Sequence, residues 1–300
     1  MAVATAQPQE MEVIPSRWAR AWKALGKFIM TKPLGAIGGA IIVVMILAAV
    51  FAPQIAPYDP YELNQTLQFG VPSLSHPFGT DEFGRDLFTR IIYGAKIALI
   101  IGFSASFLGA TGGAIVGVVS AYMGGRTDLI IQRIVDILLA FPLLILALAI
   151  ASVLGRSTFN LVIAIAIPVI PRTARIVRSS ALSAKELVYV EAARAVGSSH
   201  IRVMFRHIIP NIMAPYLIIL TAQLGSAILT EASLSFLGLG QAEPEPSWGL
   251  MLSGGAPLYA EKAPWVAIFP GVAISLAVFG FNLLGDSLRD ALDPRLRGRT

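Results

Sequence analysis

Six long apolar stretches, separated by polar segments that hold most of the charged residues, dominate the pattern of this chain. Each stretch is long enough to cross a bilayer as a helix, since about 20 residues at helical rise span the hydrocarbon core. The pattern therefore predicts an all-α membrane protein. Its six expected transmembrane helices lie at residues 34–52, 95–122, 129–154, 158–177, 214–237 and 264–284.

Two features inside these stretches bear on helix packing. Glycines are frequent in the second stretch, and small residues let neighbouring helices approach closely, so tight packing is expected there. The fourth stretch ends in IPVIPR, where Pro168 and Pro171 each remove a backbone donor. We expect this helix to kink or to stop near the two prolines.

The composition indicates that lipid surrounds much of the chain. Hydrophobic residues make up 55% of the 300 residues and charged residues only 14%, whereas soluble domains have about a quarter charged. The mean hydropathy is +0.71. The absence of cysteine excludes disulfides, thiolate catalysis and cysteine-bound metals, and it leaves the redox compartment undetermined.

Basic residues are distributed unevenly between the two sides that six spans define. The net charge is +5, which would also suit nucleic-acid binding, but lysine and arginine in a membrane chain mark the cytoplasmic loops. Most of them fall before the first span, around the second and fourth connections, and at the tail. Both termini are therefore expected in the cytoplasm. The bases on this side are Arg17, Arg20, Lys23, Lys27, Lys32, Arg126, Arg133, Arg172, Arg175, Arg178, Lys185, Arg194, Arg202, Arg206, Arg289, Arg295, Arg297 and Arg299.

The first apolar stretch and the segment after it form an N-terminal region of their own. The stretch follows basic residues, as in a signal peptide, but it is longer than a signal core and five spans follow, so we expect a retained helix. Residues 53–90 are rich in proline and acids and cannot lie unpaired in lipid, which predicts an external loop. Its acids are expected mainly to keep the loop solvated, with binding of an external protein as the alternative; they are Asp59, Glu62, Asp81, Glu82 and Asp86.

A polar interruption, EAARAVGSSHIRVMFRHIIPN, occupies residues 191–211. Ser183 followed by Glu186 has the spacing of a capping box, which predicts a helix that starts at Ser183 and ends at Gly197. One side of that helix is an apolar stripe with two alanines at its centre, a shape that admits another backbone closely. The stripe consists of Tyr189, Ala192, Ala193 and Val196.

A second amphipathic stripe is expected after Gly197, ended by Pro210; it consists of Ile201, Met204, Phe205 and Ile208. A DNA-binding helix-turn-helix has a similar arrangement of small residues and glycine. It needs a free face, however, and this loop is tethered to spans at both ends. A helix pair lying on anionic headgroups is a second interpretation. Insertion into a groove of a cytoplasmic partner explains the small stripe best, with Glu191 and Arg194 able to pair with each other or with that partner.

These residues carry a resemblance to a known family. Glu191-Ala192-Ala193, Gly197 and the final His-Ile-Ile-Pro resemble the EAA loop of ABC importer permeases, with a histidine variant that is common in the peptide-permease branch. In that family the loop is the coupling helix that seats in a cleft of the ATPase subunit. The resemblance implies ATPase-coupling roles for Tyr189, Glu191, Ala192, Ala193, Arg194, Val196, Gly197 and Pro210.

Three further stretches resemble the C component of the dipeptide/oligopeptide/nickel permease subfamily: HPFGTDEFGRDLFTRIIYGAK, EASLSFLGLG and GDSLRDALDPRLRG. The resemblance covers nearly the whole chain from about residue 33. It implies a type-1 ABC importer permease fold (MetI-like core) with an extra N-terminal helix. The implied divisions are a cytoplasmic segment at 1–33, the helix and external loop at 34–94, the type-1 domain at 95–286 and a cytoplasmic tail at 287–300.

The resemblance also implies partners and a mechanism. The partners are a second permease subunit of the B type, cytoplasmic ABC ATPase subunits, an external solute-binding protein and membrane lipid, with no nucleic acid. The mechanism is alternating access, in which ATP-driven closure of the ATPases moves the seated helices. Peptides, nickel chelates and glutathione are all carried by similar permeases, so the cargo stays open.

The sequence itself holds no catalytic motif. No G-x-x-x-x-G-K-[ST] occurs, so ATP must be bound by another polypeptide, and the zinc-protease, nucleophile-elbow and dinucleotide patterns are absent as well. His200 and His207 lie about 10 Å apart along a helix, too far to share one metal. We therefore expect no cofactor, no metal and no enzyme activity. An ion-gradient-driven transporter, the competing class, would need midplane acids and inverted repeats, of which the signs are faint.

Ionisable and polar residues inside the spans are the remaining candidates. Asp136 is expected to pair with Arg133 at i, i+3. Glu231 and Gln223 are candidates for the translocation path, although a hydrogen bond to a neighbouring helix is the favoured role for Glu231. Two tryptophans, Trp248 and Trp265, are expected at the external membrane interface without a special role.

Overall fold

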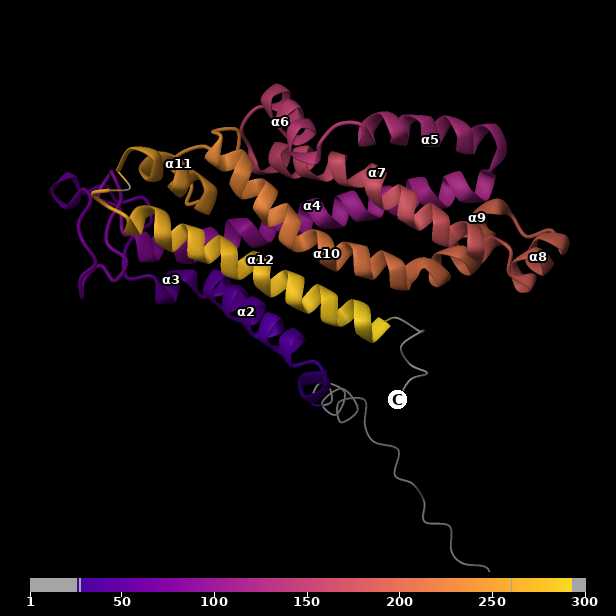
Figure 1. The fold of residues 1–300 in the computed structure, drawn as a ribbon, viewed down its shortest axis with the longest axis horizontal. Coiled ribbons are helices and arrows are strands. Elements are labelled where there is room, and N and C mark those ends of the chain that lie inside the picture. Colours follow the sequence, from indigo (N-terminus) through magenta and orange to yellow (C-terminus); the bar gives the residue numbers. More distant parts are fainter. Residues whose placement is uncertain (1–25, 27, 260, 293–300) are drawn as a thin grey trace, which may run out of the picture.

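Long helices that run roughly along one axis make up the structure, a computed structural model that describes residues 26, 28–259 and 261–292 (Figure 1). Apart from an isolated bridge between Thr80 and Asp86, no strand occurs in the described residues. The elements are α2 (Pro33–Val50), α3 (Ala52–Ile55), η1 (Gln65–Leu67), α4 (Leu87–Met123), α5 (Gly125–Leu139), α6 (Leu143–Leu154), α7 (Thr158–Lys185), α8 (Val188–Ala195), α9 (His200–Val203), the π-helix η2 (Met204–Ile208), α10 (Ile209–Phe236), α11 (Trp248–Tyr259) and α12 (Trp265–Leu292).

The expected all-α membrane architecture is confirmed. Among the described residues, five helical stretches are long and apolar enough to cross a membrane, and α5 with α6 makes a sixth if the bent pair counts as one span. Several of the basic residues counted on the cytoplasmic side lie outside the described residues; they are Arg17, Arg20, Lys23, Lys27, Arg295, Arg297 and Arg299.

The apolar pattern suggested one straight helix for the third span, but the structure has two helices there. α5 and α6 meet at an angle of 91° around the break at residues 140–142. Pro142 explains the break, because it has no N–H to continue the helix and it disfavours helical geometry at the residue before it. Hydrophobicity alone did not reveal this turn.

α4 and α7 form the most extensive helix–helix interface in the molecule. The glycines of α4 make it close: a Cβ atom at Gly113 would lie 2.5 Å from the Cβ of Thr173 and 2.6 Å from the carbonyl oxygen of Ile170. The expected tight packing is confirmed. α7 continues through Pro168 and Pro171 to Lys185, so of the two expected outcomes, a kink or a stop, the stop is excluded.

The N-terminal helix α2 packs against the last helix, α12 (Figure 1). A Cβ atom at Gly38 of α2 would lie 2.6 Å from the carbonyl oxygen of Gly280 on α12, which shows how closely the two backbones approach. Near the start of α2, the Nζ atom of Lys32 lies 2.8 Å from a carboxylate oxygen of Asp290. The extra helix is thereby fixed to the rest of the bundle along its length.

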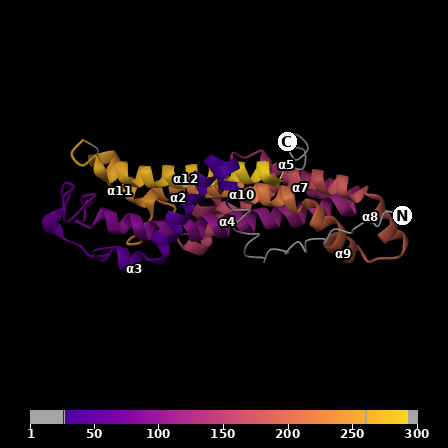
Figure 2. The same cartoon turned by 90° about the horizontal axis from the view of Figure 1, so that it is seen from below.

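The connections gather at the two ends of a flat bundle (Figure 2). Residues 56–86 and 237–247, together called the cap below, lie at the end where α4 and α12 begin. The α8–α9 segment lies at the opposite end, beyond the termini of α4 and α7 (Figure 1). The two regions that the sequence marks as polar are thus separated by the length of the spans.

Candidate functional site

α8 is a short helix that projects beyond the end of α7 (Figure 1). Its start differs from the prediction, because Ser183 is still part of α7, where its hydroxyl donates a 3.4 Å hydrogen bond to the carbonyl oxygen of Ser179. Extended backbone at Leu187 separates the two helices instead. The capping-box spacing at Ser183 and Glu186 therefore occurs inside and just after a helix, without starting one.

The end of α8 agrees with the prediction. Gly197 has φ +80°, a conformation that side-chain-bearing residues rarely adopt. Its N–H bonds the carbonyl oxygen of Arg194 at 3.0 Å, and the N–H of Ser198 bonds that of Ala193 at 3.1 Å. These two bonds form a Schellman motif, which satisfies the last carbonyl groups of the helix.

Most of α8 faces outward. Val190 is the residue that anchors it: its side chain is 0% exposed and belongs to a core cluster with residues of α4, α7 and α10. Val196, by contrast, is 82% exposed, and Tyr189 and Ala192 are exposed as well. Most of the predicted stripe is therefore an apolar surface with a fixed position that no described element covers, whereas Ala193 is half-buried.

The charged residues of α8 are also free for a partner. Glu191 and Arg194 are both exposed, and the structure shows no ion pair between these two described residues. Of the two pairing possibilities that their spacing allowed, the one within the helix is not formed.

The second predicted helix differs in how it ends. α9, η2 and α10 form one helical stretch from His200 to Phe236, so Pro210 does not stop it. Pro210 directly follows the π-helix η2 and lies inside this continuous stretch. Of the second stripe, Ile208 is buried while Ile201 and Phe205 are exposed. The polar loop thus leads directly into a membrane span.

Two contacts connect the loop to the spans. The hydroxyl oxygen of Tyr122, near the end of α4, lies 2.9 Å from Nδ1 of His200, and Asn211 of α10 donates a 2.6 Å hydrogen bond to the hydroxyl of Tyr189. A third bond joins the two spans beside these contacts: Lys185, at the end of α7, donates to the carbonyl oxygen of Tyr122 in α4 at 3.0 Å. Sequence reasoning missed these roles, since nothing in the local pattern marks residues so far apart as partners.

Ion pairs hold α5 against α7 at the same end. Arg178 makes a two-pronged contact with Asp128, with nitrogen–oxygen distances of 2.7 and 2.5 Å. Asp136 pairs with Arg175 of α7, so the predicted pair with Arg133 was wrong. The spacing rule considered only one helix, whereas the packing of α5 on α7 brings the arginine of another helix closer.

At the opposite end, the cap is built around buried charges. Asp81 is 3% exposed, and its carboxylate accepts hydrogen bonds from Nε of Arg85 at 2.6 Å and from two backbone N–H groups. Arg90 is fully buried and donates to the carbonyl oxygen of Pro60 at 2.9 Å. The expectation that the acids mainly keep this loop solvated was therefore wrong for Asp81, and also for Asp86, which is buried and caps α4.

Two groups in the cap have shifted pKa values. Burial would lower the pKa of Arg85, but the carboxylates of Glu243 and Asp81 outweigh it and raise that pKa above its ordinary value. Burial raises the pKa of the Glu82 carboxyl, and the nearby Asp81 raises it further. The salt bridge from Arg85 to Glu243, at 2.8 Å, joins the two loops of the cap.

The two tryptophans are structural anchors of this end. Trp248 is buried, and its indole N–H donates to the carbonyl oxygen of Ile91 at 3.0 Å. Trp265 donates to the carbonyl oxygen of Thr80 at 3.2 Å. Both side chains have a structural role that the sequence did not reveal, since Trp248 fastens α11 to α4 and Trp265 fastens α12 to the first loop.

Glu231, in α10, connects two elements. Its carboxylate is 2% exposed and accepts hydrogen bonds from the hydroxyl groups of Ser235 at 2.8 Å and Ser247 at 2.9 Å. Since Ser247 precedes α11, these bonds join the last turns of α10 to the start of α11. Gln223, two turns earlier in α10, is also buried.

Comparison with known proteins agrees with this geometry. Residues 113–298 match the family described as the binding-protein-dependent transport system inner membrane component, and residues 16–72 match the N-terminal transmembrane domain of oligopeptide transport permease C. The chain is 44% identical, over 97% of its length and 94% of the relative, to the dipeptide transport system permease protein DppC of Alkalihalophilus pseudofirmus. It is 42% identical, over 95% of its length and 94% of the relative, to the glutathione transport system permease protein GsiD of Escherichia coli.

Members of this family work as components of ABC transporter complexes in the inner membrane. The matched regions include α2, the first part of the external segment, the last part of α4 and all the elements from α5 to α12, with the α8–α9 loop among them. The chain therefore belongs to the family of binding-protein-dependent transport system inner membrane components, as a multi-pass permease subunit of the oligopeptide permease C type that is not itself an ATPase.

Proposed function

We propose that this chain forms one half of the translocation path of an ATP-driven importer and couples to a separate ATPase through α8. The observation that carries the proposal is the outward apolar face of α8, fixed in position by the buried Val190 and by the helix end at Gly197. A rigid, exposed apolar face that has small residues at its centre fits a groove on another protein. The coupling residues are Tyr189, Glu191, Ala192, Ala193, Arg194, Val196, Gly197 and Pro210.

Force applied to α8 has a direct route into the spans. Val190 packs in the same core cluster as Val177 of α7 and Ile212 of α10, and Asn211 bonds to Tyr189. When two ATPase subunits close on ATP, each pulls the α8 of its permease and the attached helices move with it. Because ATP favours one arrangement and its hydrolysis products the other, the path opens alternately to the two sides.

The orientation follows from the same assignment. The α8 end lies in the cytoplasm together with both termini, and the cap faces outward, where an external solute-binding protein delivers its cargo. A second permease subunit of the B type covers the other side of the path, which we place along α10; Gln223 and Glu231 are buried within this chain and support the wall of that path from behind. The excess of lysine and arginine near the α8 end supports this arrangement.

The cargo we propose is a short peptide or a peptide-like amide. The support is that relatives matched over nearly their whole length are named for dipeptide and glutathione transport. An ion-gradient-driven mechanism is disfavoured, because Glu231 is 2% exposed and already accepts two hydrogen bonds, whereas such transporters need an accessible midplane acid.

The test is recovery of the ATPase subunit with the tagged, full-length permease expressed together with its complex. Gly197→Asp and Glu191→Arg are each expected to abolish recovery, since the first strains the helix end and adds a charge, and the second reverses a charge on the docking face. Normal recovery with both variants would contradict the docking role of α8.

Matched controls are present in the chain. Gly155 has φ +79°, and like Gly197 it has no atom within 4 Å of a Cβ position, but it lies between α6 and α7. Gly155→Asp therefore introduces the same strain and charge away from α8. Glu62→Arg reverses an exposed charge in the cap. Both variants are expected to recover the ATPase normally.

A further inference from the structure

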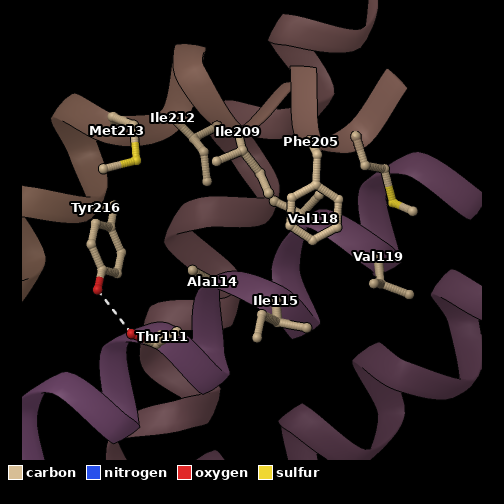
Figure 3. A pocket seen from close by; sticks show the side chains of 11 residues that line it. Thr111, Ala114, Ile115, Val118, Val119, Phe205, Ile209, Ile212, Met213 and Tyr216 are labelled. Atoms are coloured by element: carbon tan, nitrogen blue, oxygen red, sulfur yellow. Dashed lines mark hydrogen bonds between the residues drawn. The ribbon is translucent and has the colours of Figure 1, made fainter. Parts of the chain in front are cut away.

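An apolar groove of about 290 Å³ opens between α4 and the stretch where η2 passes into α10 (Figure 3). Ile115 and Val118 contribute from α4, and Phe205, Ile209 and Met213 from the other side; Figure 3 shows their side chains converging on the same space. The groove is about twice the ~150 Å³ cavity that holds a benzene molecule in an engineered protein, so it has room for a stretch of hydrocarbon chain.

The side chains that line the groove are apolar, apart from two hydroxyl groups. The hydroxyl groups of Thr111 and Tyr216 are the polar side-chain groups that reach the groove, and they bond to each other at 2.8 Å (Figure 3). Each hydroxyl is thus already satisfied across the groove. An occupant that needs hydrogen bonds would lose them here, whereas an alkyl chain would lose nothing.

The π-helix explains why the groove is open. An extra residue in the turn Met204–Ile208 widens the helix, and Ile208 turns into the core while Phe205 stays largely exposed beside α4. Such π-turns cost stability and occur frequently at functional sites.

Positive charge lies next to the groove. Arg202 precedes Phe205 by three residues, which places it on the same side of the helix one turn toward α8. Arg206 follows Phe205 in the chain and points to a neighbouring side of the helix, where its long side chain adds a second positive charge at this end of the span. Both are exposed, and neither forms an ion pair with any described acid. Arginines at the end of a span extend toward phosphate headgroups while their stems lie along apolar surface.

The depth of the groove in the membrane fits a lipid. α4 has 37 residues and is about 55 Å long at helical rise, well beyond the ~30 Å hydrocarbon core. The groove lies along the last third of α4, where the helix leaves the hydrocarbon for the headgroup layer. An alkyl-lined space with arginines at its outer end therefore spans that boundary.

We propose that this groove binds an anionic membrane phospholipid, with one acyl chain against Ile115, Phe205 and Ile209 and the phosphate group held by Arg202 and Arg206. The lipid fills the space left by the π-turn at the point where the α8–α9 loop joins α10. This site is distinct from the docking face of α8 and does not depend on it.

The experiment uses the complete transporter in vesicles of phosphatidylcholine and phosphatidylglycerol, the latter carrying a photoreactive diazirine on one acyl chain. After irradiation, mass spectrometry of peptides is expected to find the label on residues 111–119 and 204–216. Ile115→Trp fills the groove and is expected to abolish this labelling. Ile100→Trp, at another exposed isoleucine of α4 outside the groove, is expected to leave it unchanged.

The headgroup half of the site has its own readout. Arg202→Gln and Arg206→Gln are each expected to reduce labelling by phosphatidylglycerol roughly fivefold, the value for one basic residue near an anionic surface. Arg172→Gln, an exposed arginine of α7, is expected to have no effect. Equal labelling by a diazirine-bearing phosphatidylcholine would contradict the selection for an anionic headgroup.

Two outcomes would overturn the proposal as a whole. One is labelling of these peptides that Ile115→Trp does not reduce while the variant still assembles with the ATPase. The other is a photoreactive amino acid at Ile115 that cross-links to another protein chain, since the groove would then be covered by a second permease subunit and not by lipid.

Discussion

Asp81 is the residue on which the buried charges of the cap converge. Its carboxylate accepts from Arg85 and lies 3.8 Å from Nε of Arg90, which is fully buried. Asp81 is therefore an acid partner of both guanidinium groups; Arg85 has Glu243 as a second partner, and Asp81 is the acid nearest to the buried Arg90. Removing one partner of a buried ion pair is more costly than the pair itself is stabilising, because the remaining charge stays out of water.

Asp81→Ala is expected to destabilise the cap by about 3–5 kcal/mol, the usual cost of leaving a buried charge unpaired. Limited proteolysis of residues 56–86 in the purified complex measures this, with cleavage at protease levels that leave the parent chain intact. Glu62→Ala, at an exposed acid of the same loop, is the matched control and should not change cleavage. Equal protection of Asp81→Ala and Glu62→Ala would contradict the role of Asp81.

Glu82 makes the cap sensitive to pH. Burial raises the pKa of its carboxyl above the ordinary value of 4.5, so the folded cap holds this proton more tightly than the unfolded loop does. The stabilisation from the protonated form is complete below pH 4.5 and is lost as the pH rises through the raised pKa. Glu82→Gln is expected to protect the cap at neutral pH, and its advantage should vanish below pH 4.5.

The measurement is protease protection of residues 56–86 as a function of pH, for the parent chain and for Glu82→Gln. A variant that is less protected than the parent at neutral pH would contradict the burial of Glu82. Glu62→Gln removes an exposed charge from the same loop and is expected to follow the parent curve at every pH.

At the residue level, the sequence predicted what depends on local geometry. The role of Gly197 as a helix end follows from the freedom of glycine, and the structure has φ +80° there. The partners of Asp136 and His200 did not follow, because Arg175 and Tyr122 come from other helices. Side-chain partners across an interface depend on packing that a single sequence does not reveal.

At the scale of elements, α4 and α7 depend on glycine at specific positions. A Cβ at Gly113 would meet backbone atoms of α7, with Ala174 N at 3.0 Å and Ile170 O at 2.6 Å. A Cβ at the neighbouring Gly112 would meet only the side-chain end of Ile170, at 3.3 Å. The two glycines are adjacent in the chain, but a Cβ at Gly113 would meet fixed backbone atoms, whereas a Cβ at Gly112 would meet a side chain that can move.

Gly113→Ala is expected to destabilise the permease by about 1–3 kcal/mol, the usual cost of overpacking, because the two backbones must separate. Gly112→Ala is expected to be neutral or slightly stabilising, since the end of Ile170 can shift and alanine favours helix. Thermal unfolding of the purified chain in detergent compares them. Equal losses in both variants would show that the α4–α7 interface is not as close as the structure has it.

The membrane spans were predictable in number and position because hydrophobic length decides whether a segment crosses a bilayer. The ends and bends of their helices were harder to predict. Pro142 turns the third span through 91°, while Pro168 and Pro171 leave α7 continuous. The same residue type has opposite outcomes because the surroundings of α7, packed closely against α4, keep the helix together. The spacing of Ser183 and Glu186 was similarly misleading, since a cap pattern inside a longer helix has no free N–H groups to satisfy.

At the scale of the whole molecule, the α8 end and the cap are expected on opposite sides of the membrane. The chain has no cysteine, so single cysteines can be introduced without a background. Val196→Cys and Leu74→Cys both replace highly exposed side chains. In intact cells that express the permease without the ATPase, so that α8 stays uncovered, an impermeant maleimide is expected to label Leu74→Cys only, and Val196→Cys should react only after the membrane is opened. Labelling of both in intact cells, or the reverse pattern, would contradict the orientation.

The central claim is that α8 is the surface on which the ATPase docks. The most direct measurement places a cysteine at the exposed Ala192, at the centre of the stripe, and cross-links the complete transporter in its membrane with a short thiol-reactive reagent that reaches amines nearby. The account predicts a cross-link to the ATPase subunit from Ala192→Cys and none from Leu74→Cys in the cap. A transport-competent complex in which Ala192→Cys links to no ATPase, or in which Leu74→Cys does, would contradict it.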